Sequence, residues 1–232
     1  MKRAAACSLI GLCMIVIAGG SGCSMNEKLS AEEKAAAYME EKYGEEFRFA
    51  GWQTAPFGSG SKSAAVECDS LPGRMIRVDI RKNQEGAVVY SDNYTAYRME
   101  DELFRETEKV TETVYPRHKI VLRIAASDFP SGMGPGMEAK EIAGDKDTLL
   151  SVLIFAEEGE RDRREYLEVW RQAAEDAGLR MKGVLYIVDD VEKYKDISVE
   201  NYQSRTVGEN WYEASCYFAM DKAYEFYYAN WR

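Results

Sequence analysis

The sequence is poor in side chains on which many catalytic sites depend. It holds one histidine, His118, which excludes a zinc site built from several imidazoles. A Ser–His–Asp arrangement would have to use this residue, and the chain has no Gly-x-Ser-x-Gly motif. His118 stands where a strand is expected to begin, so we expect it at an exposed strand end rather than in a catalytic site.

Basic residues are scarce as well. The chain has 30 Lys and Arg against 40 Asp and Glu, a formal net charge of −10. Such a surface repels phosphate backbones and anionic lipid headgroups. Nucleic-acid binding is therefore not expected. Membrane attachment is expected to come from a lipid rather than from a basic surface.

Long hydrophobic runs are missing, and the one near the N-terminus is short. Lys2 and Arg3 precede an almost entirely apolar run at 4–17, and small residues follow it up to Cys23. A basic start, a short apolar body and a small-residue end are typical of a secretory signal. The run is shorter than the roughly 20 residues that a membrane-spanning helix needs.

The segment Gly20-Ser21-Gly22-Cys23 resembles the lipobox of bacterial lipoproteins, a family that usually has leucine or another aliphatic residue where Gly20 stands. The resemblance implies that Cys23 carries diacylglycerol through a thioether and becomes the first mature residue. Two acyl chains form a stable anchor, because each buried methylene contributes about 0.8 kcal/mol. The alternative is an ordinary secretory signal cut between residues 18 and 22, which leaves Cys23 unmodified.

These features predict three parts of the chain. Residues 1–22 are the signal peptide, 23–30 are the lipidated cysteine with a short tether, and 31–232 are an α+β domain outside the cytoplasm. The domain could divide into two subdomains, at about 31–116 and 117–232. We expect it on the extracytoplasmic face of the cell membrane, with the acyl lipid on Cys23 and no further cofactor.

Two cysteines, Cys68 and Cys216, remain after the three near the N-terminus. Each alternates with apolar residues, so both are expected to face the core of a sheet. An extracytoplasmic location permits a Cys68–Cys216 disulfide. Two buried free thiols are the equally weighted alternative.

Hydrophobic periodicity predicts an α+β fold, with a mainly antiparallel sheet and about three helices packed on it. Ser30 and Glu33 form a capping box for a helix at 31–43, and helical spacing predicts two more at 95–114 and 160–177. Alternating patterns predict the strands, which are 47–54, 62–69, 74–82, 87–90, 118–126, 149–156, 182–189 and 211–220.

The order of these elements suggests two arrangements. The strand, helix and strand at 149–189 are typical of a crossover between parallel strands. The order from 74 to 189 is compatible with a ferredoxin-like core. We expect loops at 129–144 and 191–208, and a short aromatic tail at 224–231.

The segment at 131–136 is rich in glycine, but it does not resemble a phosphate-binding loop. Pro135 removes one backbone donor, and no Lys-Ser/Thr pair follows. We expect a surface loop whose Met133 and Met137 could contact a partner. The acids that could serve a catalytic pair are expected to be solvated instead; they are Asp69, Asp79, Asp128, Asp189 and Asp190.

Aromatic residues crowd the last part of the chain, 211–232. Tyrosine and tryptophan often dominate binding surfaces, and a chain end tends to lie at the surface. We therefore predict a binding surface at Tyr227, Tyr228 and Trp231. The preferred function is a non-enzymatic lipoprotein that binds a protein partner or a small ligand at the cell envelope. The alternatives are a cell-envelope hydrolase with paired carboxylates and a structural accessory subunit of an envelope complex.

Overall fold

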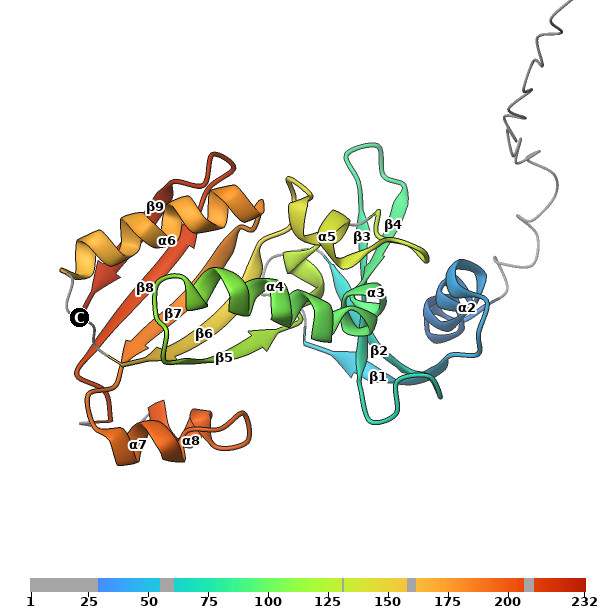
Figure 1. Ribbon diagram of the computed structural model, residues 1–232. Helices are drawn as coiled ribbons and strands as arrows, with labels where there is room; N and C mark the ends of the chain where they lie inside the picture. Colours follow the sequence, from blue (N-terminus) through green and yellow to red (C-terminus); the bar gives the residue numbers. More distant parts are fainter. Residues whose placement is uncertain (1–28, 55–60, 131, 158–161, 207–210) are drawn as a thin grey trace, which may run out of the picture.

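The computed structural model describes residues 29–54, 61–130, 132–157, 162–206 and 211–232. These residues form an α+β fold with two sheets (Figure 1). A four-stranded sheet is built from residues 48–92, and a five-stranded sheet from residues 118–231. The predicted α+β class is confirmed.

The first helix, α2 (Ala31–Tyr43), has the predicted bounds. Ser30 and Glu33 form the capping box, and Gly44 ends the helix in the left-handed region, at φ 72°. Ala35 and Met39 are fully buried against the four-stranded sheet. Helix α2 lies at one end of the molecule, at the right of Figure 1.

The four-stranded sheet is antiparallel throughout, in the order β1-β2-β3-β4. Ala64, Val66, Ile76 and Val78 form the buried face beneath α2. The predicted strands in this region are confirmed, with bounds β1 (Arg48–Gln53), β2 (Lys62–Glu67), β3 (Ile76–Lys82) and β4 (Val88–Asp92).

The helix predicted at 95–114 is divided at Met99. A short helix, α3 (Tyr94–Arg98), precedes α4 (Glu100–Glu112), because Met99 takes a non-helical backbone conformation at φ −100° and ψ 8°. Helix α4 buries Leu103, Thr107 and Val110 against the second half of the chain. It therefore connects the two sheets.

The five-stranded sheet has the order β5-β6-β7-β8-β9. The pair β6–β7 is parallel and is joined through α6 (Arg163–Ala177), as predicted, whereas the other pairs are antiparallel. Helices α4 and α6 cover one face of this sheet (Figure 1). The strands are β5 (His118–Arg123), β6 (Leu150–Ala156), β7 (Met181–Ile187), β8 (Ala214–Met220) and β9 (Phe226–Trp231).

Several predictions about the arrangement are wrong. A ferredoxin-like core does not form, because the strands before α4 belong to the four-stranded sheet. The expected loops contain short helices, and the expected aromatic tail is strand β9, which pairs with β8. The short helices are α5 (Ala139–Gly144), α7 (Val191–Asp196) and α8 (Tyr202–Thr206).

Candidate functional site

The two faces of the five-stranded sheet have different surroundings. Strand register places Ile154, Leu185 and Cys216 in one row of the inner face, which packs beneath α4 and α6. Leu153, Val184 and Tyr217 form the neighbouring row of the outer face. The side chains of this outer face are the candidates for binding, because the large helices cover the opposite side.

Helices α7 and α8 cover only one end of the outer face. Phe155, Tyr186 and Ile197 pack there in a separate hydrophobic cluster. The Lys119 ammonium donates to the carbonyl oxygens of Tyr194 and Ile197, both at 2.7 Å, which ties α7 to the sheet. Burial lowers the pKa of Lys119.

The other end of the outer face is uncovered, and we call it the open sheet face. It forms a shallow groove of about 350 Å³. Register aligns its outermost row across all five strands. The side chains of the open sheet face are Arg123, Ser151, Leu153, Lys182, Val184, Tyr217, Ala219 and Tyr228.

The charge of the open sheet face is positive. The Arg123 side chain is exposed and has no ion pair or hydrogen bond among the described residues. Lys182 pairs with the buried carboxylate of Asp128, whose Oδ2 has no hydrogen-bond partner among the described residues. The Arg232 guanidinium lies 5.2 Å from the ring centre of Tyr217. Two cations thus line the groove, of which Lys182 is paired and Arg123 is not, and Arg232 lies next to one of its tyrosines.

The floor of the groove is apolar, and two tyrosines line it. Leu153, Val184 and Ala219 provide the floor. Tyr217 is 38% exposed and Tyr228 is 44% exposed, so both rings are open to a ligand. This combination favours a ligand with an apolar part beside an anionic group, because tyrosine offers a large apolar face and a polar tip.

The three residues of the predicted binding surface do not share one surface. Tyr228 lies on the open sheet face. Tyr227 is 65% exposed but does not line the groove. Trp231 is in register with Cys216 of the inner face, packs against the main core, and has a buried indole nitrogen. It is therefore a packing residue in this structure.

The two cysteines of the domain are not bridged. Cys68 is buried in the cluster beneath α2, whereas Cys216 is buried in the cluster beneath α6. They belong to different sheets, so the structure has the free-thiol alternative. Burial raises the pKa of Cys216 to about 11, which makes this thiol a poor nucleophile. Cys23 lies outside the described residues.

The remaining candidates have structural contacts. His118 begins β5, and its Nδ1 lies 2.7 Å from the carbonyl oxygen of Tyr115. Asp190 is the N-cap of α7, and this contact with backbone amides lowers its pKa. Met133 is buried in the main core rather than exposed in a surface loop.

The other acids that sequence analysis singled out form ion pairs, apart from Asp189. Asp69 pairs with Arg48, and Asp79 pairs with Arg77. Asp128 pairs with Lys182, so a cation neutralises each of these three carboxylates. Within the described ranges, no group of three or more His, Cys, Asp or Glu side chains is placed to hold a metal ion.

Of the residues of the open sheet face, only Tyr228 belongs to the binding surface that the sequence predicts. Lys182 is the second residue of β7 and follows the buried Met181, and Arg123 and Tyr217 alternate with core residues. The alternation places Arg123 and Tyr217 on the outer face of the sheet. However, only strand register shows that they meet Tyr228, because the residues come from four strands.

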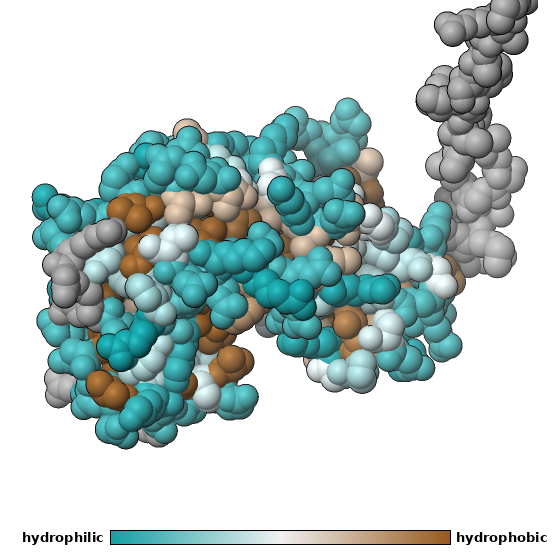
Figure 2. Space-filling view, in the orientation of Figure 1, coloured by the Kyte–Doolittle hydropathy of each residue, from teal (hydrophilic) through white to brown (hydrophobic). Residues whose placement is uncertain are grey.

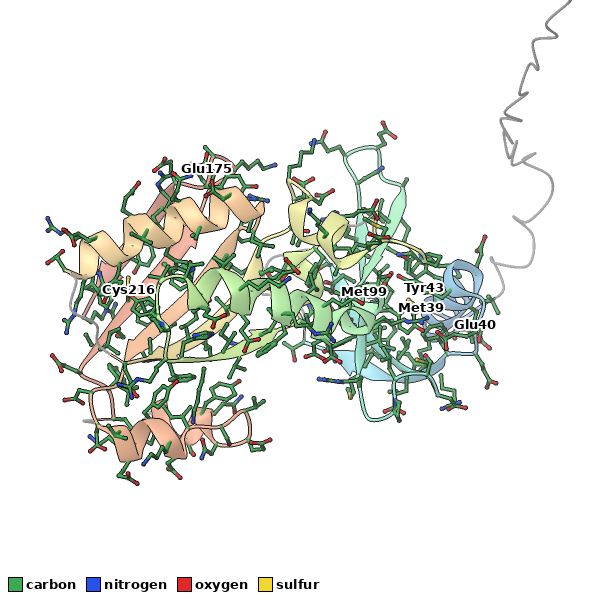
Figure 3. The ribbon with its side chains drawn as sticks, viewed as in Figure 1. Met39, Glu40, Tyr43, Met99, Glu175 and Cys216 are labelled. Carbon is green, nitrogen blue, oxygen red and sulfur yellow. The ribbon has the colours of Figure 1, made fainter. Side chains whose placement is uncertain are left out.

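A second charged cluster holds α2 in place. The Asp92 side chain is completely buried and accepts from Lys42 Nζ at 2.7 Å, Tyr38 Oη at 3.0 Å and Tyr43 Oη at 2.7 Å. Burial and the neighbouring Asp92 carboxylate raise the pKa of both tyrosines. Figure 3 shows Tyr43 and Met39 on the side of α2 that faces the rest of the chain, with Glu40 farther out.

Hydrophobic side chains are visible on the surface only in places. In the view of Figure 2 the surface is mostly hydrophilic, with hydrophobic patches between α4 and α6 and near α7 and α8.

None of the helices in the described ranges combines the length and the apolar character needed to cross a membrane.

Comparisons with known proteins give little further information. No protein-family model matches the chain, and no curated protein is similar to it in sequence. The chain is similar to a crystal structure of a DUF5037 family protein from Ruminococcus gnavus, with 14% identity over 72% of this chain and 78% of that chain. The TM-score of 0.34 is low.

Proposed function

We propose that this protein is a lipoprotein that binds a protein partner or a small ligand outside the cytoplasm while Cys23 anchors it to the membrane. The observation that supports the binding role is the open sheet face, where Tyr217 and Tyr228 stand beside Arg123 and Lys182 over an apolar floor. The N-terminal resemblance to the lipoprotein signal supports the anchor.

The chemistry of the open sheet face favours an anionic ligand with an apolar part. Arg123 presents a planar fork of donors that matches a carboxylate, and it has no competing partner in the described ranges. Lys182 is already paired with Asp128, so it contributes attraction without being the main contact. A peptide with an acidic side chain next to an apolar one satisfies both requirements.

A thermal-shift measurement tests this proposal. The probes are short peptides that contain Glu beside Leu or Phe, each with a partner peptide in which Gln replaces Glu. A ligand at 100 times its dissociation constant adds about 2.7 kcal/mol of stability. For a chain of this size the midpoint should rise by roughly 5–10 °C with an acidic peptide. The Gln peptides should give a much smaller rise.

Two substitutions locate the binding. Tyr228→Ala and Arg123→Glu should each remove most of the shift. Tyr227→Ala is the matched control, because this tyrosine is the more exposed neighbour and does not line the groove. A shift that survives Tyr228→Ala, or no shift with any acidic peptide, would contradict binding at this face.

A further inference from the structure

A second pocket of about 320 Å³ lies at the first turn of α2, and we call it the anchor pocket. Helix α2 covers only part of its face of the four-stranded sheet, and the pocket begins where the helix begins. Trp52, Lys62 and Lys82 belong to this face by register, since Trp52 is opposite Ala64 and Lys62 is opposite Ile80. The lining residues are Ala31, Lys34, Trp52, Lys62, Ile80, Arg81, Lys82, Val88 and Tyr90.

The anchor pocket concentrates positive charge. Three of its lining residues are lysines on this face, Lys34, Lys62 and Lys82, and none of the lining residues is Asp or Glu. Among the described residues, no ion pair neutralises Lys34, Lys62 or Lys82. One acid is close by, because Glu32 accepts a hydrogen bond from the Trp52 indole at 3.4 Å. The chain has a negative net charge as a whole, but this pocket has a local excess of positive charge.

The apolar residues of the pocket are unusually exposed. Trp52 is 43% exposed and Val88 is 52% exposed, and the Lys62 ammonium lies 5.8 Å from the Trp52 ring centre. Tryptophan beside lysine is the combination that favours the headgroup level of a membrane, where an indole is half in apolar surroundings and a cation meets phosphate.

The position of the pocket in the chain points to the same membrane that holds the lipid. Cys23 precedes Ala31, a lining residue, by only eight residues. Even a fully extended chain of that length spans at most about 28 Å. A lipid on Cys23 would therefore keep the pocket within reach of the headgroups of the same leaflet.

We propose that the anchor pocket binds the phosphate groups of anionic phospholipids, with Trp52 and Val88 at the headgroup level. This contact adds to the lipid anchor. Its biological role rests on the proposed function, in which Cys23 holds the protein at the membrane. The contact orients the protein, because a lipid on a short tether alone leaves the domain free to rotate.

Vesicle co-sedimentation tests the contact without the anchor. Every described helix, strand and core residue lies after residue 28, so a chain that begins at Ser24 keeps them all. The vesicles are phosphatidylcholine, with or without phosphatidylglycerol at about one third of the lipid. The protein should bind the anionic vesicles only, and binding should weaken as salt screens the charges.

The triple variant Lys34→Glu, Lys62→Glu and Lys82→Glu locates the contact. Its apparent affinity for anionic vesicles should fall by at least about 100-fold, since the loss of each basic residue near an anionic surface costs roughly five-fold and the three glutamates add repulsion. The matched control is Lys109→Glu, Lys195→Glu and Lys222→Glu, which makes the same change in net charge at exposed positions elsewhere. It should lose much less. Circular dichroism verifies that both variants are folded.

Tryptophan fluorescence gives an independent measurement. Emission should shift to the blue on anionic vesicles, and Trp52→Phe should abolish that shift. No binding to anionic vesicles, equal binding to neutral ones, or equal losses in the two triple variants would overturn the proposal. None of these outcomes depends on Cys23, which the tested chain lacks, so they are distinct from a failure of the lipid anchor.

Discussion

At the scale of residues, the ion pair of Lys42 and Asp92 is a contact whose loss should be costly, because the Asp92 carboxylate is completely buried. Asp92 has a fully buried side chain that depends on one cation and two tyrosine hydroxyls. Lys42→Met keeps the aliphatic stem but leaves the carboxylate without its cation. We expect a loss of about 3–5 kcal/mol in the free energy of unfolding, because an unpaired buried charge is costly. Urea denaturation measures it.

Two controls separate the buried charge from general effects of losing a lysine. The double variant Lys42→Met with Asp92→Asn should recover part of the loss, because no charge is then buried. Lys195→Met removes the cation of an exposed pair with Glu192 and should cost less than about 1 kcal/mol. If Lys42→Met costs no more than Lys195→Met, the buried Asp92 carboxylate does not need the Lys42 cation.

At the scale of elements, the sequence was most informative where periodicity is long or caps are distinct. Helix α2 was predicted to the residue from its capping box and Gly44, and the parallel β6–β7 pair from its crossover pattern. Helices α5 and α7 were missed because each has only six residues, too few to display a helical period. Strand β9 was missed because it lies at the sheet edge, where most of its side chains are exposed and no alternation appears.

The candidate site is predictable only in part, because the sequence does not show which strands pair. Tyr228 was identified because aromatic residues crowd the end of the chain. Arg123, Lys182 and Tyr217 could be assigned to outer positions of their strands, but the pairing of those strands depends on contacts between residues far apart in the chain. The division into two sheets has the same origin, which explains why a single ferredoxin-like core was the wrong expectation.

Gly183 in β7 allows the central strands of the five-stranded sheet to approach closely. An added Cβ would lie 1.7 Å from the carbonyl oxygen of Val152 in β6. Gly183→Ala should therefore destabilise the protein by about 3 kcal/mol or more, measured by urea denaturation. Gly144→Ala is the matched control, because nothing lies within 4 Å of its added Cβ and alanine favours the helix that it ends. Similar stability of the two variants would show that the sheet adjusts easily at Gly183.

At the scale of the whole molecule, the two proposed surfaces lie in different halves. The anchor pocket belongs to α2 and the four-stranded sheet, whereas the open sheet face belongs to the five-stranded sheet and extends from β5 to β9. Strand β9 lies on the far side of the molecule from α2 (Figure 1). If the anchor pocket contacts the membrane, β9 lies in the half of the molecule that is farther from it. A ligand or partner then reaches the open sheet face without competing with the lipid surface.

The proposed lipid anchor is tested separately, by replacing Cys23. In a bacterial host that expresses the full chain, Cys23→Ala should abolish the incorporation of labelled palmitate, since the cysteine thiol is the atom that would carry diacylglycerol. The variant should also move from the detergent phase to the aqueous phase in a phase-separation assay, because two acyl chains provide the stable anchoring. Cys216→Ala is the control, since this thiol is buried in the core and should leave the label unchanged. Label that persists in Cys23→Ala, or a wild-type chain without label, would contradict the lipoprotein assignment and leave the vesicle contact of the anchor pocket as a separate question.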